Sequence, residues 1–311
     1  MTRPVATPTA SVSRADGGGW AIAAWFGVVA IWTTTPLTIK WTAEGLGPIE
    51  GIAGRTLIGS AIFLLAFLTP WLKFDHRPET WRAAGIAGAF AYASMLLLYV
   101  GAPSVPSGLM SVVYGATPLT TALLAAFVWR SERLTAAKAA GVLLGVGGLV
   151  LIFGDGASLG PGASLGLALL ATSMVLNCLN MLILKRVARD LPVMSFTAAS
   201  VWLNAPALVL TWWLVDGELP TVVATRDLLA VMWLGVMGTV VGFLCFYYAL
   251  KHMQASKVAL IMVITPVTAL LLGHLANGER LPPTIWMGSL LVLAGIACAT
   301  LFEGTPIEIR E

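Results

Sequence analysis

The stretch Thr117–Leu134 reads TPLTTALLAAFVWRSERL, and it recurs in outline at Thr265–Leu281 as TPVTALLLGHLANGERL. Each copy is an apolar run that opens with Thr-Pro and closes with Glu-Arg-Leu. Upstream of the two copies, Tyr99 and Ser107 match Tyr248 and Ser256 at a constant offset. Because separate motifs agree in register around two apolar runs, the sequence indicates an internal duplication.

The composition indicates an integral membrane protein. Hydrophobic residues make up 58% of the 311 residues and charged residues only 11%, whereas ordinary globular domains are roughly 25% charged. The net charge of +3 is scattered between apolar segments, so no nucleic-acid-binding face is expected. The three cysteines lie inside apolar runs without metal-ligand spacing, and we expect neither a disulfide nor a metal or other cofactor.

Apolar runs long enough to cross a bilayer, about 20 residues each, recur along the whole chain. Backbone groups must be hydrogen-bonded inside lipid, so each run is expected to be a helix. The ten predicted spans are 20–42, 49–72, 81–101, 105–129, 135–154, 162–185, 193–215, 227–250, 255–277 and 283–302.

The spans divide the chain into two repeats with a tail at each end. Residues 1–19 are rich in Thr, Pro, Ser, Ala and Gly, and they predict a flexible cytoplasmic tail. A cleaved signal is not expected, since the first apolar run is itself long enough to span. The repeats are predicted at 20–157 and 158–303, with five spans each, and residues 304–311 form a second cytoplasmic tail.

The basic residues predict the orientation. With the N-terminus in the cytoplasm, all but four of the 18 Lys and Arg residues fall on the inner side. The four on the outer side are Lys40, Arg55, Arg226 and Arg280. This bias follows the positive-inside rule, so we expect a multi-pass protein of a bacterial inner membrane with both termini cytoplasmic.

An odd number of spans in each copy means that the two halves cross the membrane in opposite directions. Lys40 ends the first span outside, and its counterpart Lys185 ends the sixth span inside. Inverted repeats are typical of transporters that alternate access between two sides. The sequence therefore predicts an all-α membrane protein with two inverted five-helix repeats around a central cavity, and a transporter rather than an enzyme or a channel.

The same residues resemble the drug/metabolite transporter superfamily, and within it the EamA-type exporters. The resemblance is carried by Trp32 and Lys40 in the first span, Arg55 in the second, and Pro118 before Glu-Arg-Leu in the fourth. It implies a cavity built from spans one to four and six to nine, with spans five and ten at the periphery. It also implies export of amino acids, related metabolites or drugs. The second repeat departs from the pattern, because Asn177 stands where Trp32 does and no arginine matches Arg55.

Pro118 and Pro266 are candidate substrate-contacting residues because each lies near the middle of a span. Proline frees a backbone carbonyl one turn earlier, and such a carbonyl can face a substrate at the membrane midplane. Alternatively, a neighbouring hydroxyl, that of Thr117 or Thr265, satisfies the carbonyl and leaves only a kink. The sequence leaves both interpretations open.

Polar and aromatic side chains within the spans are further candidates. Asn177 and Asn180 share one helical face and align with the turn of the first repeat that holds Trp32 and Thr35. Their amides either hold a carboxylate or ammonium group or bond to neighbouring helices. The aromatic candidates either line a cavity or form interfacial belts. These aromatic residues are Trp32, Tyr92, Tyr114, Phe243 and Tyr247.

Charged residues near the span centres are almost absent. None of the 15 carboxylates lies near a span centre, which argues against both a buried proton carrier and a buried anion for organic cations. Arg55 either neutralises a substrate carboxylate, gates through Glu50, or positions its helix as a snorkelling cation. Glu132 and Glu279 are each expected to accept hydrogen bonds from amides at the start of the next helix.

Taken together, these patterns predict an alternating-access exporter of small neutral or zwitterionic metabolites, above all amino acids with aromatic or hydrophobic bodies. The alternative is an exporter of drugs or toxic organic cations, coupled to protons. The expected partners are a small-molecule substrate and the lipid bilayer. Both a monomer and a homodimer remain open, although the glycine stripe from Gly141 to Gly148 favours packing within the chain.

Overall fold

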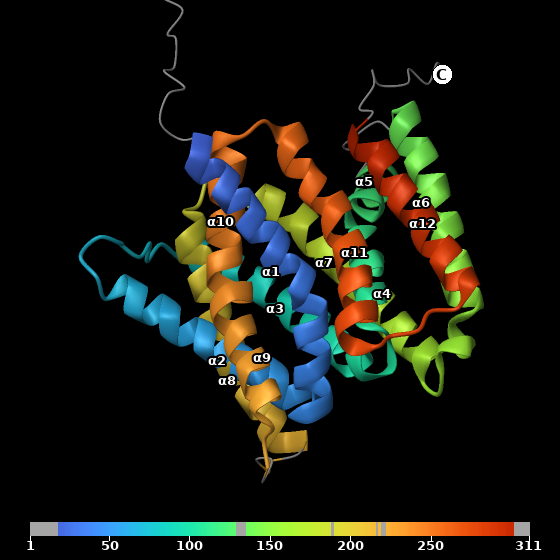
Figure 1. Cartoon of the computed structure of the whole chain (residues 1–311). Coiled ribbons are helices and arrows are strands. Elements are labelled where there is room, and N and C mark those ends of the chain that lie inside the picture. The colour runs from blue at the N-terminus through green and yellow to red at the C-terminus, as the bar shows by residue number, and fades with distance from the viewer. Residues whose placement is uncertain (1–17, 129–134, 188–189, 216, 219–221, 302–311) are drawn as a thin grey trace, which may run out of the picture.

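The computed structural model describes residues 18–128, 135–187, 190–215, 217–218 and 222–301 (Figure 1). Across these residues the regular structure is helical, and ten helical segments are long and apolar enough to cross a membrane. The predicted all-α fold with ten spans is therefore confirmed. The two predicted tails lie outside the described residues, apart from positions 18 and 19, which begin the first helix.

The first repeat contains five spans, of which the fourth is divided. Its elements are α1 (Gly18–Gly45), α2 (Pro48–Phe67), α3 (Pro78–Gly101), η1 (Ala102–Ser104), α4 (Ser107–Gly115), α5 (Thr117–Phe127), α6 (Ala136–Gly154) and η2 (Gly156–Leu159).

The second repeat also contains five spans, of which the eighth of the chain is divided. Its elements are α7 (Ala163–Val187), α8 (Val193–Val215), α9 (Thr225–Trp233), the π-helical η3 (Leu234–Val241), α10 (Gly242–His252), α11 (Ala255–Asn277) and α12 (Pro283–Leu301).

Local sequence sets several of the helix ends. Pro48, Pro78 and Pro118 each stand in the first turn of a helix, where the missing N–H costs no helical hydrogen bond. At the far end of α11, Gly278 adopts a left-handed conformation with φ of 64°, which terminates the helix. Thr135 caps α6 by accepting a bond from the Lys138 amide at 3.2 Å.

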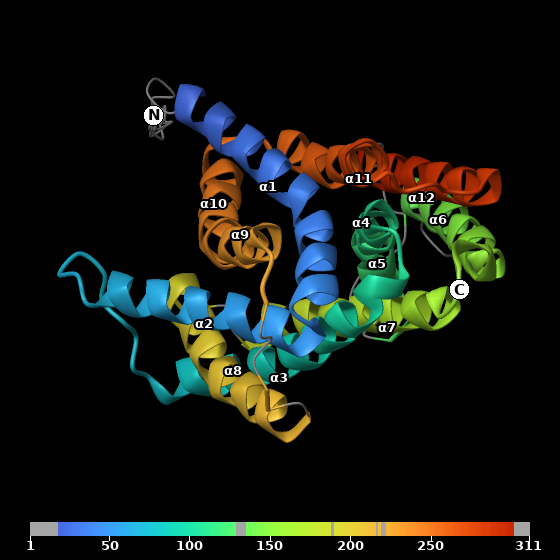
Figure 2. The same cartoon turned by 60° about the horizontal axis from the view of Figure 1, so that its bottom comes forward.

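The two repeats interlock along their whole length. Helix α3 packs against α7, α4 against α11, and α2 against α8, so each of these pairs joins one repeat to the other. Helix α1 runs between α10 and α11 (Figure 2). Helix α1 begins and α12 ends at the same end of the bundle (Figure 1), as an even number of crossings requires.

Helices α6 and α12 form a separate pair at one edge of the bundle (Figures 1 and 2). A Cβ added at Gly141 would lie 2.5 Å from the Gly295 carbonyl oxygen, and one at Gly148 would lie 2.4 Å from that of Gly288. Side chains at these positions would force the backbones apart. The glycine stripe therefore packs within the chain, at the peripheral place that the family resemblance implies.

Candidate functional site

Pro118 divides the fourth span into α4 and α5. Its ring nitrogen has no hydrogen to donate to the carbonyl of Tyr114, four residues earlier. The Thr117 hydroxyl donates to that carbonyl instead, at 2.5 Å. The carbonyl released by the proline is thus already bonded by the neighbouring threonine, which is one of the two arrangements expected from the sequence.

Pro266 lies inside α11, which continues without a break. Because residue 266 is proline, it has no N–H to donate to the Met262 carbonyl. The Thr265 hydroxyl donates to the Ile261 carbonyl instead, at 2.6 Å, so it does not satisfy the Met262 carbonyl. Gly115 faces this proline, since a Cβ at Gly115 would lie 2.9 Å from Pro266 Cγ. The proline turns of the fourth and ninth spans therefore touch where α4 and α11 cross.

A cluster of hydroxyl groups joins the first repeat to α7. The Tyr114 hydroxyl is hydrogen-bonded to the Ser173 hydroxyl. Ser94 of α3 donates to the Ser173 carbonyl at 2.9 Å, and the two serine hydroxyls are 3.0 Å apart. Asn177 follows Ser173 by about one turn and is half-buried. This brings Tyr114 and Asn177, two of the predicted site residues, to the same part of the interior.

Asn180 of α7 and Tyr92 of α3 are two further predicted site residues. Asn180 is buried, and its Oδ1 atom has no hydrogen-bond partner among the described residues. The Tyr92 hydroxyl bonds to Thr211 of α8 at 2.5 Å. The Tyr92 hydroxyl therefore links α3 to α8 and is not part of the hydroxyl cluster of Tyr114.

The bend of α1 brings Trp32 and Thr35 towards the eighth span. Pro36 lies inside α1 and cannot donate to the Trp32 carbonyl, and the Thr35 hydroxyl bonds to the Ile31 carbonyl at 2.7 Å. The Trp32 ring packs against Phe246 and Phe243, with centroids 5.2 and 6.5 Å away. Trp32 thus contacts α10 with its ring and offers a released carbonyl near the middle of its span.

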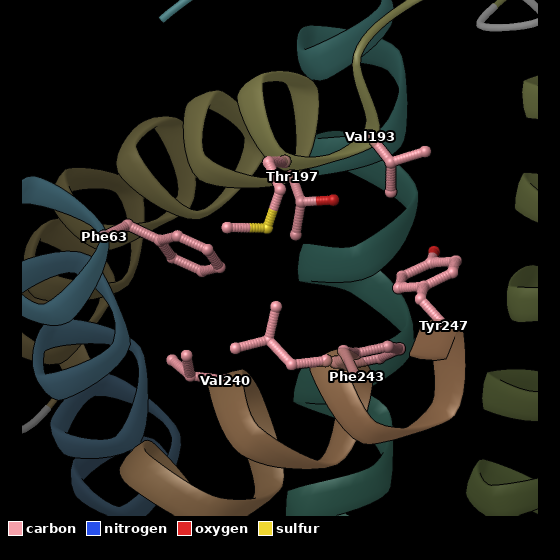
Figure 3. Close-up of a pocket in the computed structure, with 8 residues that line it drawn as sticks. Phe63, Val193, Thr197, Val240, Phe243 and Tyr247 are labelled. Atoms are coloured by element: carbon pink, nitrogen blue, oxygen red, sulfur yellow. The ribbon is translucent and has the colours of Figure 1, made fainter. Parts of the chain in front are cut away.

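Phe243 and Tyr247 line a small pocket of about 20 Å³ between α2, α8, η3 and α10 (Figure 3). Phe63, Val193 and Thr197 lie across the pocket from these two rings (Figure 3). The Phe243 and Tyr247 rings stack with centroids 6.5 Å apart, and each of these two side chains is 42% exposed. These two predicted residues therefore line a pocket separate from the hydroxyl cluster of Tyr114.

Arg55 lies deeper in its helix than any other Lys, Arg, Asp or Glu of the described residues, roughly two turns from the start of α2. Its Nε donates to the Thr239 hydroxyl in η3 at 3.0 Å.

Glu50 occupies the first turn of α2, where its carboxylate lies against Gly47. Gly47 has a φ of 109°, so the close approach and the backbone conformation both require glycine there.

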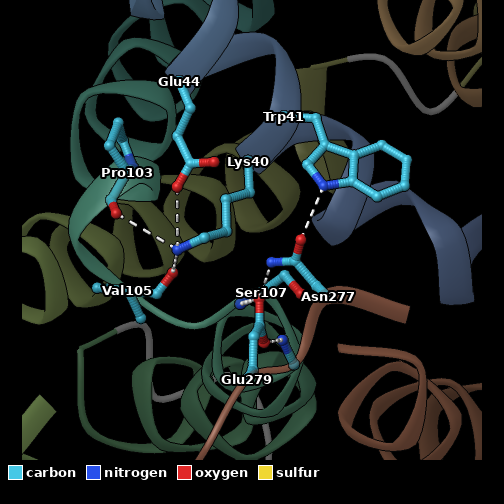
Figure 4. Close-up of polar contacts among 9 residues, drawn as sticks. Lys40, Trp41, Glu44, Pro103, Val105, Ser107, Asn277 and Glu279 are labelled. Carbon is cyan, nitrogen blue, oxygen red and sulfur yellow. Dashed lines mark hydrogen bonds and ion pairs between the residues drawn. The ribbon is translucent and has the colours of Figure 1, made fainter. Parts of the chain in front are cut away.

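We call the end of the bundle where α1 and α11 finish and α4 begins the Lys40 end; polar contacts join the two repeats there (Figure 4). The Glu279 carboxylate accepts hydrogen bonds from the amides of Ser107 and Gly108, at 2.9 and 3.3 Å. These amides begin α4, where negative charge is stabilising. The Asn277 amide group also donates to Glu279, at 3.0 Å.

Lys40 and Trp41 of α1 complete this network. Lys40 Nζ donates to the carbonyls of Val105 and Pro103, at 2.9 and 3.3 Å, between α3 and α4 (Figure 4). Trp41 Nε1 donates to the Asn277 side-chain oxygen at 3.0 Å. We refer to Lys40, Trp41, Asn277 and Glu279 as the Lys40-end network.

The expectation that Glu279 binds amides of the next helix is wrong. The next helix, α12, begins at Pro283 directly after Pro282, and prolines have no N–H to offer. The left-handed Gly278 turns the chain, and Glu279 instead meets the start of α4 in the other repeat. The matching residue Glu132 lies outside the described residues.

Sequence reasoning missed the π-helical η3 and its Thr239, which receives Arg55. The Thr239 hydroxyl donates to the Leu234 carbonyl five residues earlier, at 2.9 Å. Such π-helical stretches occur often at functional sites. The available signal was the spacing of Gly235, Gly238 and Gly242 around this threonine. Among the described residues, no group of three His, Cys, Asp or Glu side chains lies close enough to hold a metal ion.

Comparison with known proteins defines the class of this protein. The chain belongs to the EamA-like transporter family, which it matches over residues 19–154 and 164–301. It is therefore a multi-pass membrane transporter made of two related halves, as the resemblance of its motifs to EamA-type exporters predicted. A solved crystal structure with 24% sequence identity shares the fold, with a TM-score of 0.62 over 91% of this chain and 97% of that chain.

Three relatives cover nearly the same length. An uncharacterised transporter of Archaeoglobus fulgidus is 27% identical over 86% of this chain and 94% of its own. The uncharacterised inner membrane transporter YedA of Escherichia coli K12 is 25% identical over 91% of this chain and 92% of its own. A protein of the same strain, named a probable amino-acid metabolite efflux pump, is 26% identical over 86% of this chain and 91% of its own.

Proposed function

We propose that this transporter exports small neutral or zwitterionic metabolites, above all amino acids, by exposing a site alternately to the two sides of a bacterial inner membrane. The observation that carries the proposal is the chemistry of the interior. Hydroxyl groups of Tyr114, Ser94 and Ser173 meet there, one turn from Asn177. Such groups exchange hydrogen bonds with ammonium and carboxylate groups without burying a permanent charge.

The distribution of carboxylates supports a solute without net positive charge. Every Asp or Glu that lies in a helix of the described residues is in its first or last turn; these are Glu44, Glu50, Glu79 and Asp227. A buried anion for an organic cation, or a proton carrier at the span centre, is thus not part of the proposal. The relative named a probable amino-acid metabolite efflux pump is consistent with this substrate class.

The charge bias of the sequence places the Lys40 end on the outer side of the membrane, and we adopt this orientation in the proposal. The Lys40-end network then closes the outer end of the pathway. Solute would enter from the cytoplasmic side while this network is intact, and leave when it opens.

The test is counterflow in liposomes that contain the purified protein, with a panel of labelled neutral amino acids and cationic drugs. We expect saturable exchange of amino acids that does not depend on a pH gradient. Tyr114→Phe should weaken this exchange, whereas Tyr92→Phe, which removes the peripheral bond to Thr211, serves as the matched control. Transport of cationic drugs but not of amino acids, or strict dependence on protons, would contradict the proposal.

A further inference from the structure

Arg55 is a membrane-embedded cation without a carboxylate partner in the described residues. The ion pairs there join Lys40 to Glu44, Arg77 to Asp75 and Arg226 to Asp227. A charged side chain within a span is costly unless it is paired or faces a polar solute or water. Arg55 donates a hydrogen bond from Nε to Thr239, and its guanidinium group also interacts with the buried Tyr99 side chain.

The end of the guanidinium group faces a bare stretch of backbone. A Cβ added at Gly238 would lie 3.7 Å from Arg55 Nη2 and 4.0 Å from the Thr35 hydroxyl oxygen. A Cβ there would be in ordinary contact with both groups, so the tip of the arginine faces the bare backbone of η3 across a space of about one methyl group. Thr239 accepts a hydrogen bond from Arg55 Nε and so positions the guanidinium group. The two Nη atoms remain available for a ligand.

Tyr99, beside the same arginine, provides a second sign of a missing ligand. Its side chain is fully buried beside Arg55 and Thr42, and its hydroxyl has no hydrogen-bond partner among the described residues. The neighbouring Thr42 hydroxyl donates to the carbonyls of Thr38 and Ile39, and its oxygen is not hydrogen-bonded to the Tyr99 hydroxyl. A buried hydroxyl left without a partner destabilises a protein, so an oxygen atom from a bound solute would satisfy it.

We propose that Arg55 and Tyr99 bind the carboxylate of the transported solute, an inference that rests on the proposed function. Guanidinium groups pair with carboxylates through two parallel N–H···O bonds. The Tyr99 hydroxyl donates a further bond to the same carboxylate. One negative charge then neutralises the membrane-embedded arginine while the solute is bound.

The experiment compares a neutral amino acid with its amide and with the amine that lacks the carboxylate, each as competitor in liposome counterflow. The wild type should prefer the amino acid. Arg55→Met should raise the half-saturating concentration of the amino acid by about 10- to 100-fold, which is the range for a lost charged hydrogen bond. Arg55→Lys keeps the charge but loses the two-pronged geometry, and it should recover only part of the affinity.

Tyr99→Phe keeps the test decisive if the arginine variants fail to fold. It removes an unpartnered buried hydroxyl, so the empty protein should melt at the same temperature or higher, while preference for the amino acid over its amide falls about tenfold. Tyr248→Phe is the matched control, because Tyr248 is the equivalent tyrosine of the second repeat and stacks on His252 at 4.2 Å. It should leave the preference unchanged.

Three outcomes would overturn the inference. Equal competition by the amino acid, its amide and the amine in the wild type would show that no carboxylate site exists, although the proposed metabolite export would still stand. If both Arg55→Met and Tyr99→Phe keep the wild-type preference for the amino acid, the carboxylate site is likewise contradicted. If no amino acid is transported, the proposed function fails, and the site is then tested by thermal stabilisation with simple monocarboxylates; absence of stabilisation in the wild type, or equal stabilisation in Tyr99→Phe, contradicts it.

Discussion

The fourth and ninth spans hold equivalent places in the two repeats and both contain Thr-Pro, yet only the fourth is divided. The residues that precede Thr-Pro differ: Gly115 and Ala116 in the fourth span, Val263 and Ile264 in the ninth. Gly115 tolerates the break and lets α4 approach Pro266, whereas Val263 and Ile264 are half-buried side chains in a helix that continues without a break. Proline marks a weak point, and the neighbouring side chains decide whether the helix breaks there.

The third and eighth spans show the reverse difference. Helix α3 is continuous, whereas its counterpart contains the π-helical η3 without any proline. Each repeat therefore contributes one irregular span, and the two irregular spans are not equivalent. A duplicated topology has produced an asymmetric interior, with Arg55 of one repeat bonded to Thr239 of the other.

The largest effect is expected where the repeats remain alike, at the contact of α6 with α12. Gly148→Val and Gly288→Val should both lower the free energy of unfolding by more than about 3 kcal/mol, because each Cβ would lie within 3 Å of backbone atoms of the facing helix. The measurement is the melting temperature of purified protein in detergent. Gly147→Val, with no atom within 4 Å of its added Cβ, should change little, and equal melting of all variants would refute the close packing.

The next effect tests where the repeats differ. Gly115→Val gives the fourth span the residue of the ninth, and its Cβ would lie 2.9 Å from Pro266 Cγ and 3.1 Å from Ile296 Cδ1. We expect a loss of about 1–3 kcal/mol from overpacking. Gly85→Val in α3, where nothing lies within 4 Å, is the control and should be neutral in the same melting assay. A neutral Gly115→Val would show that the proline turns do not touch.

A smaller effect is expected at the Lys40 end, in the balance between closed and open states. Glu279→Gln removes the charge that faces the first amides of α4, which should cost the closed state about 1–2 kcal/mol. A cysteine at buried Ser107, in a background without native cysteines, should then react roughly tenfold faster with a membrane-impermeant maleimide.

Glu44→Gln is the matched control for this experiment. The Glu44 side chain is 38% exposed and lies 3.5 Å from Lys40, and exposed ion pairs contribute little. The labelling rate should stay at the wild-type value. Faster labelling in Glu44→Gln than in Glu279→Gln would show that Glu44, and not Glu279, stabilises the closed state.

The smallest effect concerns the link between α2 and α3, at the opposite end of the bundle. Hydrogen bonds from Arg77 and Thr80 hold the pKa of Asp75 well below its usual range. A lowered pKa in the folded state stabilises the protein above the unfolded pKa of about 4, and this contribution is lost as the pH falls towards the folded pKa. Asp75→Asn should therefore melt slightly lower at pH 7, with a difference that shrinks on acidification. A difference that grows on acidification would contradict this assignment.

The sequence predicted the spans and the duplication well, because the bilayer imposes a length and an apolar composition on every helix. The comparison of the two repeats also paired Pro118 with Pro266, and the helix turns that contain these prolines are in contact in the structure. The sequence did not predict that Tyr92 bonds to Thr211, or that Phe243 and Tyr247 line a separate pocket. Those placements depend on helix rotation, which uniformly apolar helices encode weakly.

What the sequence determined by itself is therefore the number, length and inverted order of the helices, since each follows from local composition and from repetition along the chain. The tertiary structure alone decided which spans break, that Glu279 binds the start of α4, and that Arg55 bonds to Thr239 and lies beside the buried Tyr99. These features arise from contacts between residues that are far apart in the chain, and a hydrogen bond or a close approach of that kind leaves no periodic pattern in the sequence.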